Sequence, residues 1–233
     1  MKEKESAPNY TSAELDEFFR SGALVRLGMG SRRACYRLRR GGSLCFKCYK
    51  SEDEIAEGKD PGKLNPRKLE PSVVREIEKY RFDERRNTCC QEYRYWRNLK
   101  LRAPAELMSA FPEIMEIVKT KSRGWCLVEE LIANEDGTPI VKFLPTWRKA
   151  DESGRRELLS ALDSFERMLV RHSIRFFDPQ TIMVQRTNGG FRLRVPDFEP
   201  ATRTLIPIDA IFPALTRAKI CRRFARYRKM LGL

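Results

Sequence analysis

Long apolar runs and histidine are nearly absent from this sequence, and each absence excludes a class of protein. No segment reaches the roughly 18 apolar residues that a membrane-spanning helix needs, so we expect no such helix. The opening residues, MKEKESAPNY, have no apolar stretch after their charges, so no secretory signal peptide is predicted. There are seven cysteines, an odd number that cannot all pair within the chain, and several lie inside strand-like or helix-like runs. This usage predicts reduced thiols and a cytoplasmic location.

The scarcity of histidine also argues against a zinc site. Cys45 and Cys48 form a Cys-x-x-Cys pair, but no second pair follows at the spacing of zinc ligands. The one histidine, His172, is far from them in the sequence. We therefore expect no zinc at this pair.

Signatures of specific nucleic-acid binding are absent as well. The sequence contains no helix-turn-helix, zinc-finger or RNP-type pattern, so no specific nucleic-acid partner is predicted. The formal net charge is +14, from 46 Lys and Arg against 32 Asp and Glu. Such a charge favours anionic partners: a nucleotide, an anionic small molecule, a lipopolysaccharide sugar or a membrane surface. A basic, solvated surface explains the charge equally well.

Hydropathy patterns divide the 233 residues into a strand-rich first part and a helix-rich second part. Residues 1–22 read as a flexible segment with a short helix over 13–19, for which Ser12 is the expected cap. The order of elements predicts an α+β fold of two lobes, with 23–131 rich in sheet and 132–233 reduced and mostly helical. The predicted elements are, in order, strands within 23–38 around a glycine turn, a strand over 44–49, a loop over 51–75, a long helix over 73–99, strands over 114–119 and 125–131, a helix over 152–171, a hairpin within 182–195 and a helix over 212–231.

The first candidate site is the turn Gly-Met-Gly-Ser-Arg-Arg that begins at Gly28. Glycines let a turn approach phosphate oxygens closely, and the backbone N–H groups can then donate to those oxygens. Gly28, Gly30 and Ser31 are therefore candidate nucleotide contacts. The turn is not a Walker A loop, because no Gly-Lys-Ser/Thr follows, and Arg33 stands where a third glycine is usual. An ordinary hairpin turn explains the same residues.

The second candidate is Lys47, in the strand-like segment Cys-Phe-Lys-Cys. A lysine flanked by apolar residues is costly to bury unless an anion pairs with it. Glu92, on the predicted long helix, is the natural partner, and in kinases a lysine paired in this way holds the nucleotide phosphates. Alternatively, Lys47 lies on an edge strand with its head in water. Glu129 and Glu130, in a Val-Glu-Glu-Leu segment that resembles a kinase hinge, are further candidate nucleotide contacts.

Asp197 and Thr181 are candidate ligands for Mg²⁺. Asp197 lies in Arg-Val-Pro-Asp-Phe-Glu after a predicted strand, which matches the metal-holding Asp-Phe-Gly of kinases except that Glu199 replaces the glycine. A carboxylate suits Mg²⁺, which prefers oxygen ligands. Thr181 falls on the metal-binding asparagine of kinases and can ligate only weakly. A loop aspartate that starts a turn explains Asp197 without a metal.

The catalytic base is the weakest part of the pattern. Residues 175–183, Arg-Phe-Phe-Asp-Pro-Gln-Thr-Ile-Met, lie where kinases carry their His-Arg-Asp loop. Aligning Pro179 and Ile182 with that loop places Phe176 on the catalytic aspartate, and a phenylalanine cannot accept a proton. Asp178 can replace it if the loop shifts in register. Otherwise Asp178 only starts a turn before the proline.

In their order and spacing these motifs resemble the YrbL family, the PhoP-regulatory-network proteins of bacteria, which belong to the protein-kinase-like superfamily. The resemblance implies a kinase-like fold and a role in envelope or PhoP-linked regulation. The activity is predicted from the residues instead: Lys47, Glu92 and Asp197 are present while Phe176 stands at the base position. This combination predicts a protein that binds ATP with Mg²⁺ and has weak, unconventional or no phosphotransfer activity. Members of this family tend to lack the catalytic aspartate, whereas Thr181 departs from the family's asparagine. The matching segments are 28–36, 45–47, 92–95, 124–139, 178–183 and 204–207.

Two other interpretations remain open. The chain after Asp197 is short and has no Ala-Pro-Glu segment, which favours a kinase for a small molecule or a lipopolysaccharide sugar over one for proteins. The basic helix over 212–231 favours a pseudokinase or adaptor without enzymatic activity that binds an anionic partner. The expected packed face of this helix consists of Leu215, Ala218, Cys221, Phe224 and Ala225.

Overall fold

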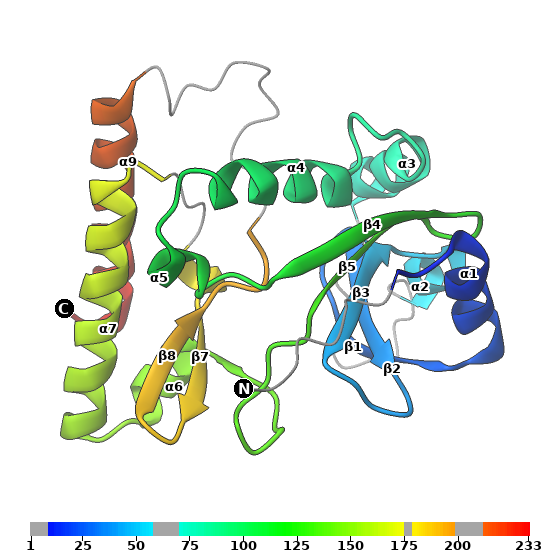
Figure 1. Ribbon diagram of the computed structural model, residues 1–233. Helices are drawn as coiled ribbons and strands as arrows, with labels where there is room; N and C mark the ends of the chain where they lie inside the picture. Colours follow the sequence, from blue (N-terminus) through cyan, green and yellow to red (C-terminus); the bar gives the residue numbers. More distant parts are fainter. Residues whose placement is uncertain (1–8, 58–69, 175–178, 199–211) are drawn as a thin grey trace. The chain divides into compact units, whose positions relative to one another are not determined.

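The computed structural model describes residues 9–57, 70–174, 179–198 and 212–233 (Figure 1). The fold is α+β, and the chain divides into two compact units. The first unit comprises residues 1–94 and 113–131, and the second comprises residues 95–112 and 132–233. Residues 95–112 therefore belong with the second unit, although the sequence analysis assigned them to the first lobe.

The first unit is built on an antiparallel sheet of five strands in the order β1-β2-β3-β5-β4. Residues that pair directly across neighbouring strands point to the same face, so the register decides which side chains meet. The strands are β1 (Leu24–Met29), β2 (Arg33–Leu38), β3 (Leu44–Tyr49), β4 (Ile114–Thr120) and β5 (Gly124–Glu130).

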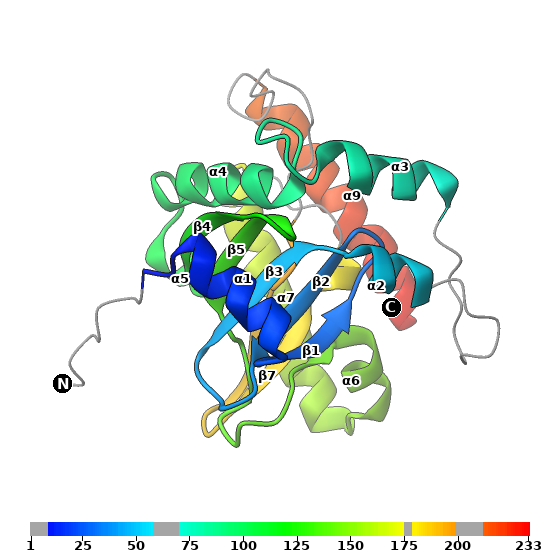
Figure 2. The same ribbon diagram turned by 90° about the vertical axis from the view of Figure 1, so that its right-hand side faces the viewer.

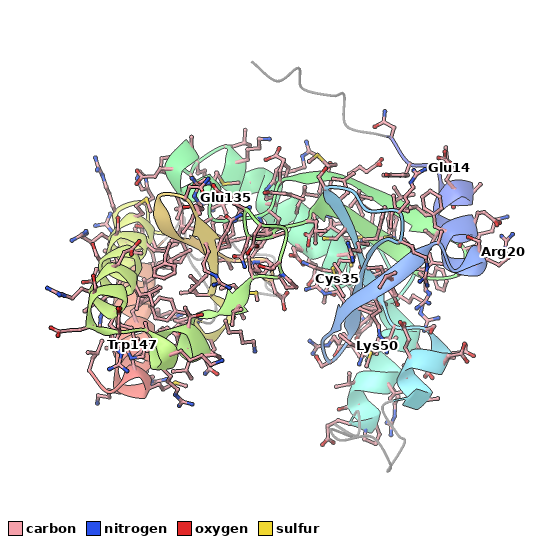
Figure 3. All side chains as sticks on the ribbon, turned by 90° about the horizontal axis from the view of Figure 1, so that it is seen from below. Glu14, Arg20, Cys35, Lys50, Glu135 and Trp147 are labelled. Atoms are coloured by element: carbon pink, nitrogen blue, oxygen red, sulfur yellow. The ribbon has the colours of Figure 1, made fainter. Side chains whose placement is uncertain are left out.

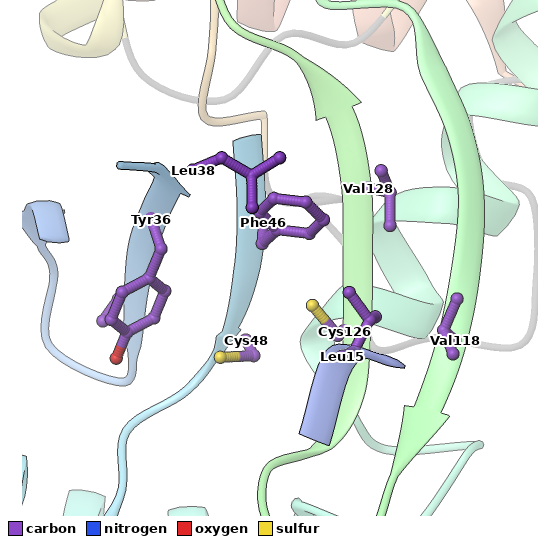
Figure 4. Close-up of a cluster of buried hydrophobic side chains, with 9 residues drawn as sticks. Leu15, Tyr36, Leu38, Phe46, Cys48, Val118, Cys126 and Val128 are labelled. Carbon is purple, nitrogen blue, oxygen red and sulfur yellow. The ribbon is translucent and has the colours of Figure 1, made fainter. Parts of the chain in front are cut away.

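One face of this sheet is apolar and is covered by helix α1 (Ser12–Ser21) (Figure 2). The helix begins with a capping box: the Thr11 hydroxyl accepts from the Glu14 N–H, and the Glu14 carboxylate accepts from the Thr11 N–H. The expected cap, Ser12, is instead the first helical residue. Leu15 and Phe46 are fully buried in the core between helix and sheet (Figure 4). The core residues are Leu15, Ala34, Tyr36, Leu38, Phe46, Cys48, Val118, Cys126 and Val128.

The long helix expected over 73–99 is wrong, because the structure has two helices, α3 (Pro71–Tyr80) and α4 (Thr88–Lys100). Side chains in the intervening segment satisfy the backbone groups that a continuous helix would have paired. Asp83 accepts from the N–H groups of Arg85 and Arg86. Asn87 donates to the carbonyl of Arg81 and accepts from the N–H of Cys89 in the first turn of α4.

The segment between α3 and α4 also packs against the start of β5. Gly124 has a φ of +70°, and a Cβ atom at this position would overlap the carbonyl oxygen of Arg81. That carbonyl accepts from the N–H of Trp125, and the Arg81 guanidinium donates to the carbonyl of Lys50. Only glycine permits this close approach between the segment and the sheet.

The loop expected over 51–75 contains a short helix, α2 (Glu52–Glu57). Its Glu54 is buried, accepts hydrogen bonds from the Tyr36 hydroxyl and the Ser51 N–H, and forms an ion pair with Arg123. The sequence carries a local signal for this helix that the prediction missed. Ser51-Glu-Asp-Glu54 is a capping box, in which the Ser51 N–H donates to the Glu54 carboxylate and the Glu54 N–H donates to the Ser51 hydroxyl.

The second unit contains two long helices, α7 (Glu152–Arg171) and α9 (Pro213–Leu231), which contact each other. Arg228 of α9 forms ion pairs with Asp163 and Glu166 of α7. The Trp147 indole N–H donates to the carbonyl of Leu231 at 3.0 Å, which ties the last turn of α9 to α6 (Figure 3). The remaining elements are α5 (Ala105–Met108), α6 (Phe143–Lys149), η1 (Pro179–Thr181) and the sheet of β6 (Val141–Lys142), β7 (Met183–Thr187) and β8 (Gly190–Arg194).

The packed face expected for α9 is wrong except for Phe224. Leu215, Ala218, Cys221 and Ala225 are exposed. Spacings of three and four residues put a different stripe against the rest of the unit. The buried residues of α9 are Thr216, Ile220, Phe224, Tyr227 and Leu231.

Within the described ranges, no helix is long and apolar enough to cross a bilayer. All seven cysteines are free thiols. Cys45 and Cys48 are three residues apart on β3, and successive side chains of a strand point to opposite faces, so the two thiols lie on opposite sides of the sheet. Their pairing partners on β5, Glu129 and Cys126, are also three residues apart. These two thiols therefore cannot bind one zinc ion together.

Candidate functional site

The second face of the five-stranded sheet buries charged side chains beside the apolar side chains of Tyr49 and Leu127. Cys35 pairs with Lys47 across β2 and β3, and Cys45 pairs with Glu129 across β3 and β5. Arg33 lies two residues before Cys35 and so belongs to the same face. The pairing of three strands thus brings Arg33, Lys47 and Glu129 together, although they are far apart in the sequence.

Lys47 is the centre of this cluster. Its ammonium nitrogen lies 3.1 Å from Oε1 of Glu92 and 2.9 Å from Oε1 of Glu129. Lys47 is only 7% exposed, Glu92 is fully buried, and Glu129 is 2% exposed. The expected pairing of Lys47 with Glu92 is confirmed, and an edge-strand lysine with its head in water is excluded.

Contacts with β3 fix α4, which supplies Glu92. The Thr88 N–H donates to the Tyr49 hydroxyl at 3.2 Å, and the Cys89 thiol donates to the Lys47 carbonyl at 3.3 Å. One turn further along the helix, Glu92 faces the same strand. The helix is therefore held to the strand that carries its ionic partner.

Arg33 is the member of the cluster that sequence reasoning missed. It is buried, and its guanidinium donates to Oε2 of Glu92, so the two oxygens of this carboxylate bind two different cations. The only sequence signal was negative, since Arg33 replaces an expected glycine. Its register opposite Tyr49 could not be known without the strand pairing.

Glu129 was predicted to contact a nucleotide as part of a hinge-like segment. In the structure, its side chain forms an ion pair with Lys47. Burial raises the pKa of its carboxyl, Glu92 raises it further, and Lys47 and Arg33 lower it, with the outcome at about 7. Its Oε1 also accepts weakly from the Cys45 thiol. Its other oxygen, Oε2, is buried and has no hydrogen-bond partner among the described residues.

The main-chain donors of the hinge-like segment are engaged within the first unit. The Glu130 N–H donates to the Glu113 carbonyl at 2.8 Å, and the Leu131 N–H donates to the Ser43 carbonyl at 2.7 Å. The Glu130 carboxylate accepts from the Glu113 N–H at 3.2 Å. These donors hold the ends of β3, β4 and β5 together.

The glycine turn connects β1 and β2 near this face. Gly28 pairs with Cys35, and the Gly30 N–H donates to the Arg33 carbonyl at 2.8 Å, which leaves Ser31 and Arg32 at the tip. Neither Gly28 nor Gly30 has a positive φ. A Cβ atom at Gly28 would meet nothing within 4 Å, and one at Gly30 would only reach ordinary contact distance. The fold itself therefore does not require glycine at either position.

The candidate metal ligands belong to the second unit. Thr181 ends η1, just before β7, and Asp197 follows β8 and is exposed. Because Met183 pairs with Arg194, the chain enters and leaves the β7–β8 hairpin at the same end. The two candidates flank this end. Asp178 lies outside the described residues, as does Phe176.

In the described part of the chain, no three His, Cys, Asp or Glu side chains gather closely enough to hold a metal ion. The chain matches no protein-family model, and a search of curated proteins finds no match. The residues of the site are therefore the basis for a functional assignment.

Proposed function

We propose that the first unit is a protein-kinase-like lobe in which Lys47 binds the phosphates of ATP with Mg²⁺. The observation that supports this most strongly is the buried ion pair between Lys47, on the third strand, and Glu92, on the helical segment between the third and fourth strands. In protein kinases, a lysine on the third strand pairs with a helix glutamate and must be in place for phosphate binding.

Two cations of this face are the groups that would bind a polyphosphate. Arg33 and Lys47 are two buried cations on one face of the sheet, and two buried cations are strong partners for an anion. The glycine turn beside them carries no side chain that would block a ligand at Gly28. A turn of this kind offers backbone N–H groups to phosphate oxygens.

Asp197 and Thr181 would hold Mg²⁺ in the second unit, since their oxygens suit this ion. When bound, Mg²⁺ neutralises charge on the β- and γ-phosphates. In the sequence, Phe176 stands at the position of the catalytic aspartate of kinases and cannot accept a proton. We therefore propose weak, unconventional or no phosphotransfer activity. Asp178 is the residue that would accept the proton if transfer occurs. A role in envelope or PhoP-linked regulation is part of the same proposal and is supported by the sequence resemblance alone.

Calorimetric titration with Mg·ATP tests the binding proposal. We expect saturable binding to the wild type and at least a tenfold loss in Lys47→Ala, because removal of one close cation from a buried phosphate costs more than about 1.4 kcal/mol. Lys121→Ala is the matched control, since Lys121 is an exposed lysine of the same unit. Absence of binding to the wild type, or equal binding to Lys47→Ala, would contradict the proposal.

The outer face of α9 supports a second candidate function, attachment to an anionic membrane surface. Leu215 and Met230 are 56% and 45% exposed, and the helix contains no acidic residue. Exposed cations lie between these apolar ends at helical spacing, at Arg222, Arg226 and Lys229. Cations bind lipid headgroups and exposed apolar side chains enter the acyl boundary, a combination that nucleic acid would not need.

Sedimentation with phosphatidylglycerol-containing vesicles tests this second function. We expect Arg222→Glu with Arg226→Glu to abolish binding at 0.15 M salt. The control, Arg156→Glu with Arg167→Glu, makes the same change in charge at exposed positions of α7 and should retain it. An equal loss of vesicle binding in both double variants would show that binding depends on the net charge of the protein and not on α9. Binding of RNA in place of vesicles would overturn the membrane assignment.

A further inference from the structure

The two carboxylates on Lys47 are bound in unequal ways. Glu92 uses both oxygens, one on Lys47 and the other on Arg33. Glu129 uses Oε1 on Lys47 and the Cys45 thiol, while its buried Oε2 has no hydrogen-bond partner among the described residues. Glu92 is therefore the fixed partner of the lysine, and Glu129 is the one that a ligand can replace.

We propose that Glu129 is an internal anion that occupies Lys47 in the free protein and sets the affinity of this site for nucleotide phosphate. The proposal rests on the proposed function, because it specifies how the same lysine takes up its ligand. Glu129 is a positioning residue in this role, since it acts on the ligand through Lys47.

The physical reason is crowding of negative charge. A phosphate that reaches Lys47 competes with Oε1 of Glu129 for the ammonium. A phosphate beside an ionised, buried Glu129 also places like charges together where water screens them poorly. Binding is therefore favoured when Glu129 takes up a proton or moves away from Lys47.

The groups that face Glu129 come from three elements. Lys47 and Cys45 lie on β3, Arg33 lies on β2, and Glu92 lies on α4. With a pKa of about 7, the neutral and ionised forms of Glu129 coexist at neutral pH. Lower pH favours the neutral form, which competes less strongly than a carboxylate with phosphate for Lys47.

The consequence is measurable as a pH dependence of affinity. If only the neutral form admits phosphate, apparent affinity falls with the neutral fraction, which drops about tenfold between pH 6 and pH 8 for a group that titrates near 7. We expect wild-type affinity for Mg·ATP to fall by about this factor. Glu129→Gln should bind about tenfold more tightly than wild type at pH 8 and show a flat profile over this range.

Glu78→Gln, an exposed change on α3 of the same unit, is the matched control and should follow the wild-type profile. Protonation of Mg·ATP itself affects wild type, Glu129→Gln and Glu78→Gln equally. Differences between their pH profiles therefore arise from ionisable groups of the protein. If Glu129→Gln has the affinity and pH profile of wild type while Lys47→Ala has lost binding, the role of Glu129 is refuted and the nucleotide site stands. If neither wild type nor any variant binds Mg·ATP at any pH, the proposed function fails, and this inference fails with it.

A second measurement needs no variant and so does not depend on the folding of Glu129→Gln. Calorimetry of wild type at pH 7.5, in two buffers with different ionisation enthalpies, gives the number of protons exchanged on binding. We expect net uptake of a fraction of a proton in excess of that of Mg·ATP alone. Zero uptake or net release would overturn the proposal.

Discussion

The two faces of the five-stranded sheet differ in what holds them together. One face packs apolar side chains against α1, around the fully buried Phe46. The other face buries Arg33, Lys47, Glu92 and Glu129 in an ionic cluster. Burial of apolar surface drives folding, whereas a buried ionic cluster repays its desolvation only when the partners match. The apolar face therefore provides stability, whereas the ionic face keeps four charged side chains buried despite the free-energy cost of their desolvation.

The largest expected effect is a test of the apolar face. Phe46→Ala should lower the free energy of unfolding by about 3–5 kcal/mol, since it leaves a large cavity in a closed core. Denaturant unfolding measures this value. Phe82→Ala removes the same side chain from a position that is 47% exposed and should cost far less. Equal losses would remove the distinction between core and surface in this unit.

A slightly smaller effect is expected on the ionic face. Glu92→Ala should cost about 3 kcal/mol, because it leaves Lys47 and Arg33 buried without their shared carboxylate. The double variant Lys47→Met with Glu92→Met should recover part of this loss, since an apolar pair has no charge to desolvate. If Glu92→Ala unfolds like wild type, the cluster does not constrain the fold.

The pH dependence of stability sharpens the comparison further. The folded-state pKa of Glu129 is raised to about 7 from an ordinary value near 4.5, so the folded protein binds the proton more tightly than the unfolded chain. The stabilisation is fully present below the ordinary pKa and is lost as pH rises through about 7. Between pH 6 and 8.5, wild type should lose about 1.4 kcal/mol relative to Glu129→Gln in urea unfolding. Parallel curves would contradict the raised pKa.

The smallest expected effect concerns the helix that covers the apolar face. Thr11→Ala removes the capping hydroxyl and should cost about 1 kcal/mol in thermal or denaturant unfolding. Ser12→Ala, one residue later and already inside the helix, should change stability by only a few tenths of a kcal/mol. The reverse order would restore Ser12 as the cap.

Sequence patterns predicted the strands well because alternation is a local signal, and 44–49 is one example. The pairing of Lys47 with Glu92 was also predictable, since a lysine in an apolar strand demands an anion. The roles of Arg33 and Glu129 were not, because they depend on the register between strands far apart in the chain. The face of α9 was misassigned because its buried stripe includes Thr216 and Tyr227, which a purely apolar pattern leaves out.

The segment between α3 and α4 resembles a hinge in the ribbon, but its contacts hold it rigidly against the sheet. The carbonyl of Arg81 touches Gly124 so closely that no side chain fits there, and it also accepts from Trp125 and Asn87. The segment cannot open without separating from the end of the sheet. The amide protons of Asn87 and Cys89, which are buried and donate within this segment, should therefore exchange with solvent as slowly as those of the central strands.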